Sequence, residues 1–404
     1  MLSLLAAILV FGVIILFHEF GHFLFAKLGG ICVLEFSLGM GPRLFSFKRG
    51  DTRYSLKLLP FGGSCMMLGE DEDPENMEER AEKNIRKKSL ALSEEEEAEG
   101  EHTQSDEELQ IRENGSEDER NQESPIRFAP DGTPVKGLAF HEASVFARFL
   151  TIAAGPVFNF ILALVCGIAV VAYAGCQPAE IVKVQEGSPA AEAGLQPGDV
   201  ITRLNGKKIH LYQEVVMQNT FHPGEPVKLE YERSGQTYTA SLTPAYSEEM
   251  GGYLMGISGG ASKPSSSIFE TIRYSVYEFR YMVNLTFKSL QMLLTGQVST
   301  KDVAGPVGIV VMIDKTVEAS SAYGILNVLI NLANMCLILS ANLGIMNLLP
   351  IPALDGGRLV FILLEAVRGK PVDPEKEGMI HMAGMAVLMV LMVMILFNDI
   401  MNLF

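Results

Sequence analysis

Residues 2–26 read LSLLAAILVFGVIILFHEFGHFLFA, an apolar run whose second half holds the polar cluster His18-Glu19-Phe20-Gly21-His22. A helix of this length spans the roughly 30 Å hydrocarbon core of a bilayer. The run has no basic leader and no small-residue cleavage site, so we expect a permanent helix and not a cleaved signal peptide. Three further apolar blocks of similar length follow it: residues 149–174, 324–350 and 379–397. The sequence predicts a polytopic α-helical membrane protein with four transmembrane helices.

The charge of the chain is concentrated in one segment. The net charge is −16 over 404 residues, and residues 70–124 alone account for −15 of it. The rest is close to neutral and has no basic patch, which excludes a nucleic-acid partner. We expect residues 70–135 to form an acidic disordered loop, because they are too polar to offset their chain entropy. The five cysteines form no CxxC pair, so no disulfide framework is expected.

Composition changes divide the rest of the chain. Residues 31–67 alternate apolar and polar side chains between glycines, which indicates strands and a hairpin at Gly62-Gly63. Residues 268–294 have helical apolar spacing with five charges, which favours an interfacial amphipathic helix over a fifth span. The predicted regions are a first helix with a β-hairpin region (1–69), the acidic loop (70–135), a second helix (136–178), a β-rich domain (179–260), the amphipathic helix with a connector (261–323) and the last two membrane helices (324–404).

Lysine and arginine placement predicts the orientation. They cluster after the first helix, before the second helix and between the third and fourth. Because cytoplasmic loops carry the excess of these residues, the loop after the first helix is predicted to be cytoplasmic and residues 179–260 to lie outside.

The polar cluster in the first helix has metal-site spacing. On a helix, His18 and His22 share a face and can bind one zinc ion, with Glu19 beside the metal-bound water as a general base. Two exposed histidines and a solvated glutamate are the alternative. That alternative is costly here, since an unpaired carboxylate inside a membrane helix costs several kcal/mol.

A third ligand is expected from another membrane helix. Asp355 follows the third apolar block, directly after the prolines at 350 and 352. A carboxylate there would complete a three-ligand site that leaves the fourth position to water. A helix stop with an aspartate cap is the alternative.

Three motifs resemble the site-2 protease family of intramembrane zinc metalloproteases, and most closely its bacterial RseP-type (regulator of sigma-E protease) branch. The motifs occur in order over nearly the whole chain: His18-Glu-Phe-Gly-His22, Ala154-Gly-Pro-Val-Phe-Asn159 and Leu354-Asp-Gly356. The resemblance implies that His18, His22 and Asp355 bind zinc and that Glu19 is the catalytic base. It also implies that Asn347 contacts the substrate and that the Gly62-Gly63 region offers an edge strand to it. For Asn159, helix packing and a supporting catalytic role are both open.

Residues 188–206, SPAAEAGLQPGDVITRLNG, resemble the bacterial PDZ signature. A PDZ fold has a groove that accepts an extended peptide as an added strand. Many RseP-type relatives carry two such domains in tandem, whereas residues 179–260 have room for one.

The sequence therefore predicts a zinc-dependent intramembrane endopeptidase of the cytoplasmic membrane, with its active site towards the cytoplasm. By resemblance, its substrates are single-span membrane proteins already cut by another protease, such as anti-sigma factors or remnant signal peptides. The alternative is a non-catalytic PDZ membrane scaffold with a vestigial metal site. The intact Glu19 argues against it.

Overall fold

The computed structural model describes residues 2–70, 127–128, 134–297 and 305–401. The chain forms two compact units, each described by itself below. The first comprises Met1–His18, Pro156–Leu349 and Ala386–Phe404, and the second comprises Glu19–Gly155 and Pro350–Met385. Most of the predicted acidic loop lies outside the described residues. At its end, β3 (Arg127–Phe128) pairs with β4 (Pro134–Val135), so this part of the expected loop has strand structure.

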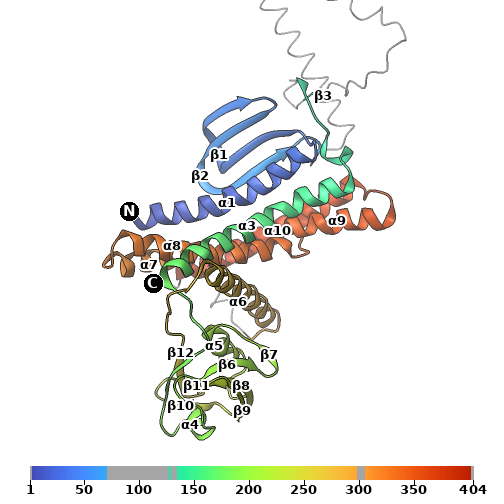
Figure 1. Ribbon diagram of the computed structural model, residues 1–404. Helices are drawn as coiled ribbons and strands as arrows, with labels where there is room; N and C mark the ends of the chain where they lie inside the picture. Colours follow the sequence, from blue (N-terminus) through green and yellow to red (C-terminus); the bar gives the residue numbers. More distant parts are fainter. Residues whose placement is uncertain (1, 71–126, 129–133, 298–304, 402–404) are drawn as a thin grey trace, which may run out of the picture. The chain divides into compact units, whose positions relative to one another are not determined.

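Four helices of the described chain are long and apolar enough to cross a membrane. They confirm the four predicted transmembrane helices: α1 (Leu2–Leu28), α3 (Val145–Ala174), α8 (Ile325–Leu348) and α10 (Pro374–Met401). Their most apolar windows differ in burial, from 44% for α8 to none for α10. Helix α8 is therefore the most buried of the four, and the apolar window of α10 has no buried residues. Figure 1 labels these elements.

The second unit holds a β-sheet made of β1 (Val33–Arg49) and β2 (Thr52–Met67). Phe36 pairs with both Tyr54 and Cys65, and Tyr54 pairs in turn with Phe47. The two long strands therefore behave as four short ones, in the order 63–67, 33–38, 52–59 and 43–49. Gly62 and Gly63 lie within β2 and not at a hairpin turn, which corrects the sequence prediction. Gly62 has φ +80°, which glycine adopts without strain.

One face of this sheet packs on α1. The rings of Phe36 and Tyr54 lie 5.2 and 5.9 Å from the ring of Phe23. On the other side Glu35 is buried and accepts two hydrogen bonds from Arg43, at 3.0 and 2.7 Å. This guanidinium holds the pKa of Glu35 down at about 2. The remaining elements of the unit are η2 (Phe140–Glu142) and α9 (Asp355–Arg368).

The first unit contains the β-rich domain, and its structure confirms the predicted PDZ fold. Its core includes Ile181, Ile201, Val227 and Leu229, all almost fully buried. The main sheet has the order β7-β6-β8-β9, and β12 pairs with β5 and β10 with β11. The elements are β5 (Ile181–Val184), α4 (Pro189–Glu192), β6 (Val200–Leu204), β7 (Lys207–Lys208), α5 (Tyr212–Phe221), β8 (Val227–Arg233), β9 (Gln236–Leu242), β10 (Ala245–Ser247), β11 (Gly252–Leu254) and β12 (Ile257–Gly259).

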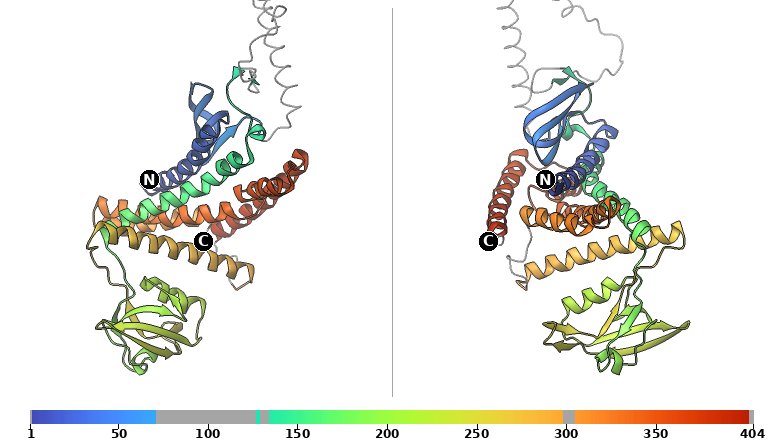
Figure 2. Two further views of the ribbon diagram at one scale, coloured as in Figure 1. Left: turned by 45° about the vertical axis from the view of Figure 1, so that its right-hand side comes forward. Right: turned by 90° about the vertical axis from the view of Figure 1, so that its left-hand side faces the viewer.

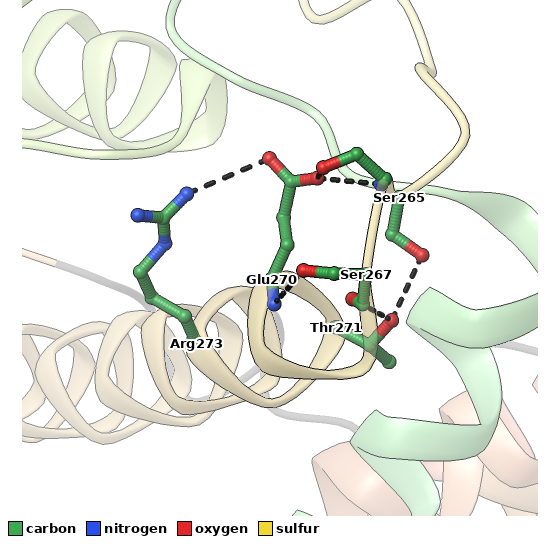
Figure 3. A network of polar contacts seen from close by, with 6 residues as sticks. Ser265, Ser267, Glu270, Thr271 and Arg273 are labelled. Atoms are coloured by element: carbon green, nitrogen blue, oxygen red, sulfur yellow. Dashed lines mark hydrogen bonds and ion pairs between the residues drawn. The ribbon is translucent and has the colours of Figure 1, made fainter.

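Helix α6 (Ile268–Leu294) follows this domain, over the residues predicted for the amphipathic helix. Its first turn is capped, because the Ser267 hydroxyl accepts from the Glu270 amide at 3.2 Å. Figure 3 shows this cap, in which the Glu270 carboxylate also bonds Ser266 and faces Arg273 at 3.5 Å. The helix contacts both α5 and α8 (Figure 2) and is not among the four helices apolar enough to span a membrane.

Helix α7 (Pro306–Ser321) was expected only as part of a connector. Its N-terminus is capped from α10, which follows much later in the sequence. The buried Asp399 carboxylate accepts from the amides of Gly305, Val307 and Gly308 at 2.9 to 3.1 Å. These bonds satisfy amide groups that the first turn of a helix leaves without partners.

The PDZ domain is attached to α6 by polar and aromatic contacts. Arg280 of α6 donates to Glu214 of α5 at 3.1 Å, and the Tyr277 ring stacks on His210 at 3.8 Å. Glu278 lies near this contact. Burial, with the nearby carboxylate of Glu214 as a smaller cause, raises the pKa of Glu278 from 4.5 to about 7.

We predict that Glu278→Gln changes how stability depends on pH. A carboxyl with a raised pKa contributes stability that is complete below pH 4.5 and is lost as pH rises through about 7. Glutamine stays neutral, so the gain in unfolding free energy from the substitution should be about 1–3 kcal/mol larger at pH 8 than at pH 5. Thermal unfolding in detergent measures it. The exposed Glu248→Gln is the control, and an equal pH dependence in both variants would contradict the assignment.

Candidate active site

The site begins with two buried histidines on α1. His18 and His22 are 9% and 6% exposed and lie one turn apart on the same continuous helix. Their spacing is therefore set by the helix itself, as the sequence predicted.

Helix α3 orients His22. The Nδ1 atom of His22 lies 2.9 Å from the carbonyl oxygen of Thr151. If Nδ1 carries the proton and donates it there, Nε2 keeps its lone pair for a metal. The close approach needs Gly21, because a Cβ at that position would lie 2.4 Å from the Ala154 carbonyl oxygen. The glycine between the two histidines thus lets α3 reach the ring.

Asp355 faces His22. Its Oδ2 atom lies 3.4 Å from His22 Nε2, from the first turn of α9. Gly357 allows this helix to start directly after the proline turn, since a Cβ there would lie 2.5 Å from the Ile351 carbonyl oxygen. Asp355 thus begins a helix, and it also points at the second histidine of the motif.

Two asparagines contact His18. The side-chain amide of the fully buried Asn159 lies 3.2 Å from Nδ1, and that of Asn347 lies 3.3 Å from Nε2. Asn159 is held by Ser340, whose hydroxyl donates to its backbone carbonyl at 2.8 Å. Its Oδ1 atom has no hydrogen-bond partner among the described residues. A 180° turn of the amide would let this oxygen accept from Nδ1–H, as Thr151 does for His22.

The donor set fits a zinc ion. His22 and Asp355 offer ligand atoms that face each other, and His18 offers a third from one turn earlier on the same helix. Two ligand atoms about 2.0–2.1 Å from a tetrahedral zinc are about 3.3–3.4 Å apart. The 3.4 Å between His22 and Asp355 matches that spacing. Imidazole and carboxylate are common zinc ligands, and contacts to Nδ1 are typical of their surroundings.

Glu19 lies near the sheet that carries Gly62 and Gly63. Burial raises the pKa of the Cys65 thiol, and the Glu19 carboxylate raises it further. Cys65 belongs to the outer strand 63–67 and pairs with Phe36. The carboxylate of the predicted base therefore acts electrostatically on the predicted substrate strand.

Sequence reasoning missed several of these partners. Thr151 acts through a backbone carbonyl, and no side-chain pattern indicates that role. Arg148 donates to Glu365 at 3.0 and 2.5 Å and so joins α3 to α9 behind the site. Arg148 and Glu365 are isolated charges beside apolar blocks, and this was the signal in the sequence that could have indicated their pairing.

Comparisons with known proteins agree over the full length of the chain. The model of peptidase family M50 matches residues 6–391. The zinc metalloprotease RasP of Shouchella clausii is 37% identical, over 100% of this chain and 99% of that protein. The regulator of sigma-W protease RasP of Bacillus subtilis is 34% identical, over 100% of this chain and 99% of that protein. The probable protease eep of Enterococcus faecalis is 35% identical over 100% of both chains.

Among solved structures, the PDZ domain of the SdrC-like protein from Listeria innocua is 25% identical, with a TM-score of 0.19. It covers 22% of this chain and 99% of that one. The family match and the full-length relatives confirm the resemblance read from the three motifs. The chain belongs to peptidase family M50, the intramembrane zinc metalloproteases of the site-2 protease type.

Proposed function

We propose that His18, His22 and Asp355 hold the zinc ion of this metalloendopeptidase and that Glu19 is its general base. The 3.4 Å approach of Asp355 to His22, with His18 one turn earlier on the same helix, carries the proposal. When bound, zinc polarises the scissile carbonyl and makes a bound water acidic enough to react near neutral pH.

The side chains of the protein have separate tasks in this reaction. Glu19 follows His18 directly, so its carboxylate can take the proton of the attacking water and pass it to the leaving amine. Asn347 contacts His18 from the side of Nε2 and is placed to hold the substrate backbone. The carbonyl of Thr151 and the amide of Asn159 hold the two histidine rings.

The substrate class follows from the membrane setting. A peptide bond inside a helix is shielded, so a transmembrane substrate must be extended before it can be cut. Unwinding exposes peptide groups that lipid cannot satisfy, and an edge strand offsets that cost with main-chain hydrogen bonds. We propose that strand 63–67, with Gly62 at its start, is that edge. The substrates would be single-span membrane proteins already cut by another protease, such as anti-sigma factors or remnant signal peptides.

We further propose the cytoplasmic membrane as the location, with the sheet side cytoplasmic and the PDZ domain outside. Lysine and arginine placement supports this orientation. A cavity of about 470 Å³ between α5 and β12, lined in part by Val215, Asn219 and Ile257, is suited to an extended peptide. The catalytic relatives leave the scaffold alternative without support.

We predict that His18→Ala, His22→Ala and Asp355→Ala each lose most of the bound zinc. Glu19→Gln should keep zinc at wild-type stoichiometry and lose cleavage, because it removes a base and no ligand. Metal analysis of the purified protein and cleavage of a single-span substrate in detergent measure the two properties. Full zinc content in the Asp355 variant would rule out that residue as the third ligand.

We predict that substrate recognition depends on helix stability and on the edge strand. Glycine or proline near the scissile bond of a substrate should speed cleavage, and leucine or alanine should slow it. Asn347→Ala should lower turnover about tenfold or more without loss of zinc. Equal rates across substrates of graded helix propensity would refute the extended-strand mechanism and leave the zinc site in place.

Two glycine substitutions in the sheet test the role of the edge strand. Gly62→Ala and Gly41→Ala both place a side chain at a positive φ, +80° and +87°. A Cβ at Gly62 would also crowd Met40 at 3.1 Å, whereas one at Gly41 meets only Leu59 at 3.9 Å. We expect cleavage to slow much more in the Gly62 variant, with equal zinc in both. Equal loss would mean that backbone strain in the sheet, and not the edge, is responsible.

We predict opposite labelling of two exposed positions, Lys48→Cys and Gln236→Cys. A membrane-impermeant thiol reagent should label position 236 in intact cells and position 48 only after permeabilisation. Four of the five native cysteines are buried, which keeps the background low. Labelling of both positions from the same side would overturn the proposed orientation.

A further inference from the structure

The turn that leads into Asp355 has an unusual backbone. Helix α8 ends at Leu348 and α9 begins at Asp355, with two prolines between them. Ala353 has φ +75°, one of three positive values at non-glycine residues of the described chain. A left-handed conformation is strained for an ordinary L-residue, because its Cβ comes too close to the following carbonyl oxygen. The other two residues, Asn205 and Ser234, have polar side chains that can bond locally, but alanine has none, so a neighbour must hold this turn.

Helix α10 supplies that neighbour. The amide of Ala353 donates a hydrogen bond to Nδ1 of His381 at 2.9 Å. The His381 side chain is 15% exposed, and its ring lies 5.5 Å from the ring of Phe361 on α9. Its Nε2 atom lies 3.8 Å from a carboxylate oxygen of Glu377. A carboxylate there favours the tautomer with the proton on Nε2, which leaves Nδ1 as the acceptor that Ala353 needs.

A second residue on the same face of α10, Gly384, packs against the turn. Gly384 is three residues after His381, so the two share a helix face. A Cβ at Gly384 would lie 2.4 Å from Pro352 Cβ and 2.7 Å from its carbonyl oxygen. The backbone of the turn therefore lies against α10 at a distance that only glycine permits.

Taking Asp355 as the proposed zinc ligand, we propose that His381 is a positioning residue for the reaction. His381 accepts a hydrogen bond from the Ala353 amide and so stabilises the left-handed turn. This turn sets the direction of the Asp355 side chain, two residues later, towards His22. Gly384 allows the same turn to lie close against α10. Since metal ligands must be held to within about 0.5 Å, a small shift of this turn separates Asp355 from the histidines.

The test measures the zinc dissociation constant of the purified protein by competition with a chromophoric chelator, beside cleavage of a single-span substrate. His381→Ala should weaken zinc binding by about 10- to 100-fold, the usual effect of removing an outer partner of a metal site. His381→Asn keeps an acceptor oxygen near the place of Nδ1 and should stay within a few-fold of wild type. Equal losses in the two variants would overturn the role of the acceptor.

A double variant tests whether His381 acts through the turn. Glycine adopts φ +75° without the cost that alanine has, so Ala353→Gly should restore much of the zinc affinity lost in His381→Ala. A residue that only packs α10 against α9 would not be rescued in this way. Failure of the double variant to recover affinity would overturn the proposal, even if the single His381→Ala protein does not fold.

Two glycines of α10 give a matched control. Gly384→Ala adds a methyl group against Pro352, whereas a Cβ at Gly378 meets nothing within 4 Å. We expect weaker zinc binding in the first variant and wild-type binding in the second. Asp355→Ala separates the two proposals: if it keeps zinc, the assigned ligand is wrong. If it loses zinc while His381→Ala and Gly384→Ala bind like wild type, only the positioning role is wrong.

Discussion

The structure depends on one constraint, the placement of His18, Glu19 and His22 inside an apolar helix. Polar groups in hydrocarbon have no water to satisfy them, so their partners must come from the protein. The surrounding helices meet this requirement with backbone and amide groups. Thr151 and Asn159 from α3 reach the two rings, and Asp355 from α9 faces the second. The polar atoms that the membrane cannot accommodate thus have partners within the protein.

These contacts require the helix backbones to lie close together, and glycine residues allow this. Gly21 admits the α3 backbone, and Gly357 lets α9 begin beside the proline turn. The lipid side of a membrane helix gives no hydrophobic drive for association, so packing and hydrogen bonds determine which faces meet. Gly21 therefore does more than fill space, because it lets the α3 backbone bring the Thr151 carbonyl within reach of His22.

Much of the fold could be read from the sequence because its signals are local. Apolar runs of membrane length gave the four spans, and the spacing of His18 and His22 gave the metal face. The PDZ signature and the amphipathic spacing of residues 268–294 are likewise patterns within one segment. Each of these features is set by neighbours in the chain.

The rest depends on pairs that are distant in sequence. The double pairing of Phe36 with Tyr54 and Cys65 follows from sheet register, which alternation alone does not determine. The contact of His381 with the Ala353 amide involves a backbone group, and α7 is completed by a carboxylate from another helix. None of these contacts produces a recognisable pattern within a single segment of the sequence. Whether the site residues bind zinc as proposed stays a prediction.

The cap of α7 has a consequence for how the protein is made. Asp399 lies 94 residues after Gly305, whose amide it accepts. At translation rates of about 5–20 residues per second, the first turn of α7 waits on the order of 5–20 seconds for its carboxylate partner. During that interval α6, α7 and α8 can already be synthesised while α10 is not. An earlier helix of this unit is therefore completed only once α10 has been synthesised.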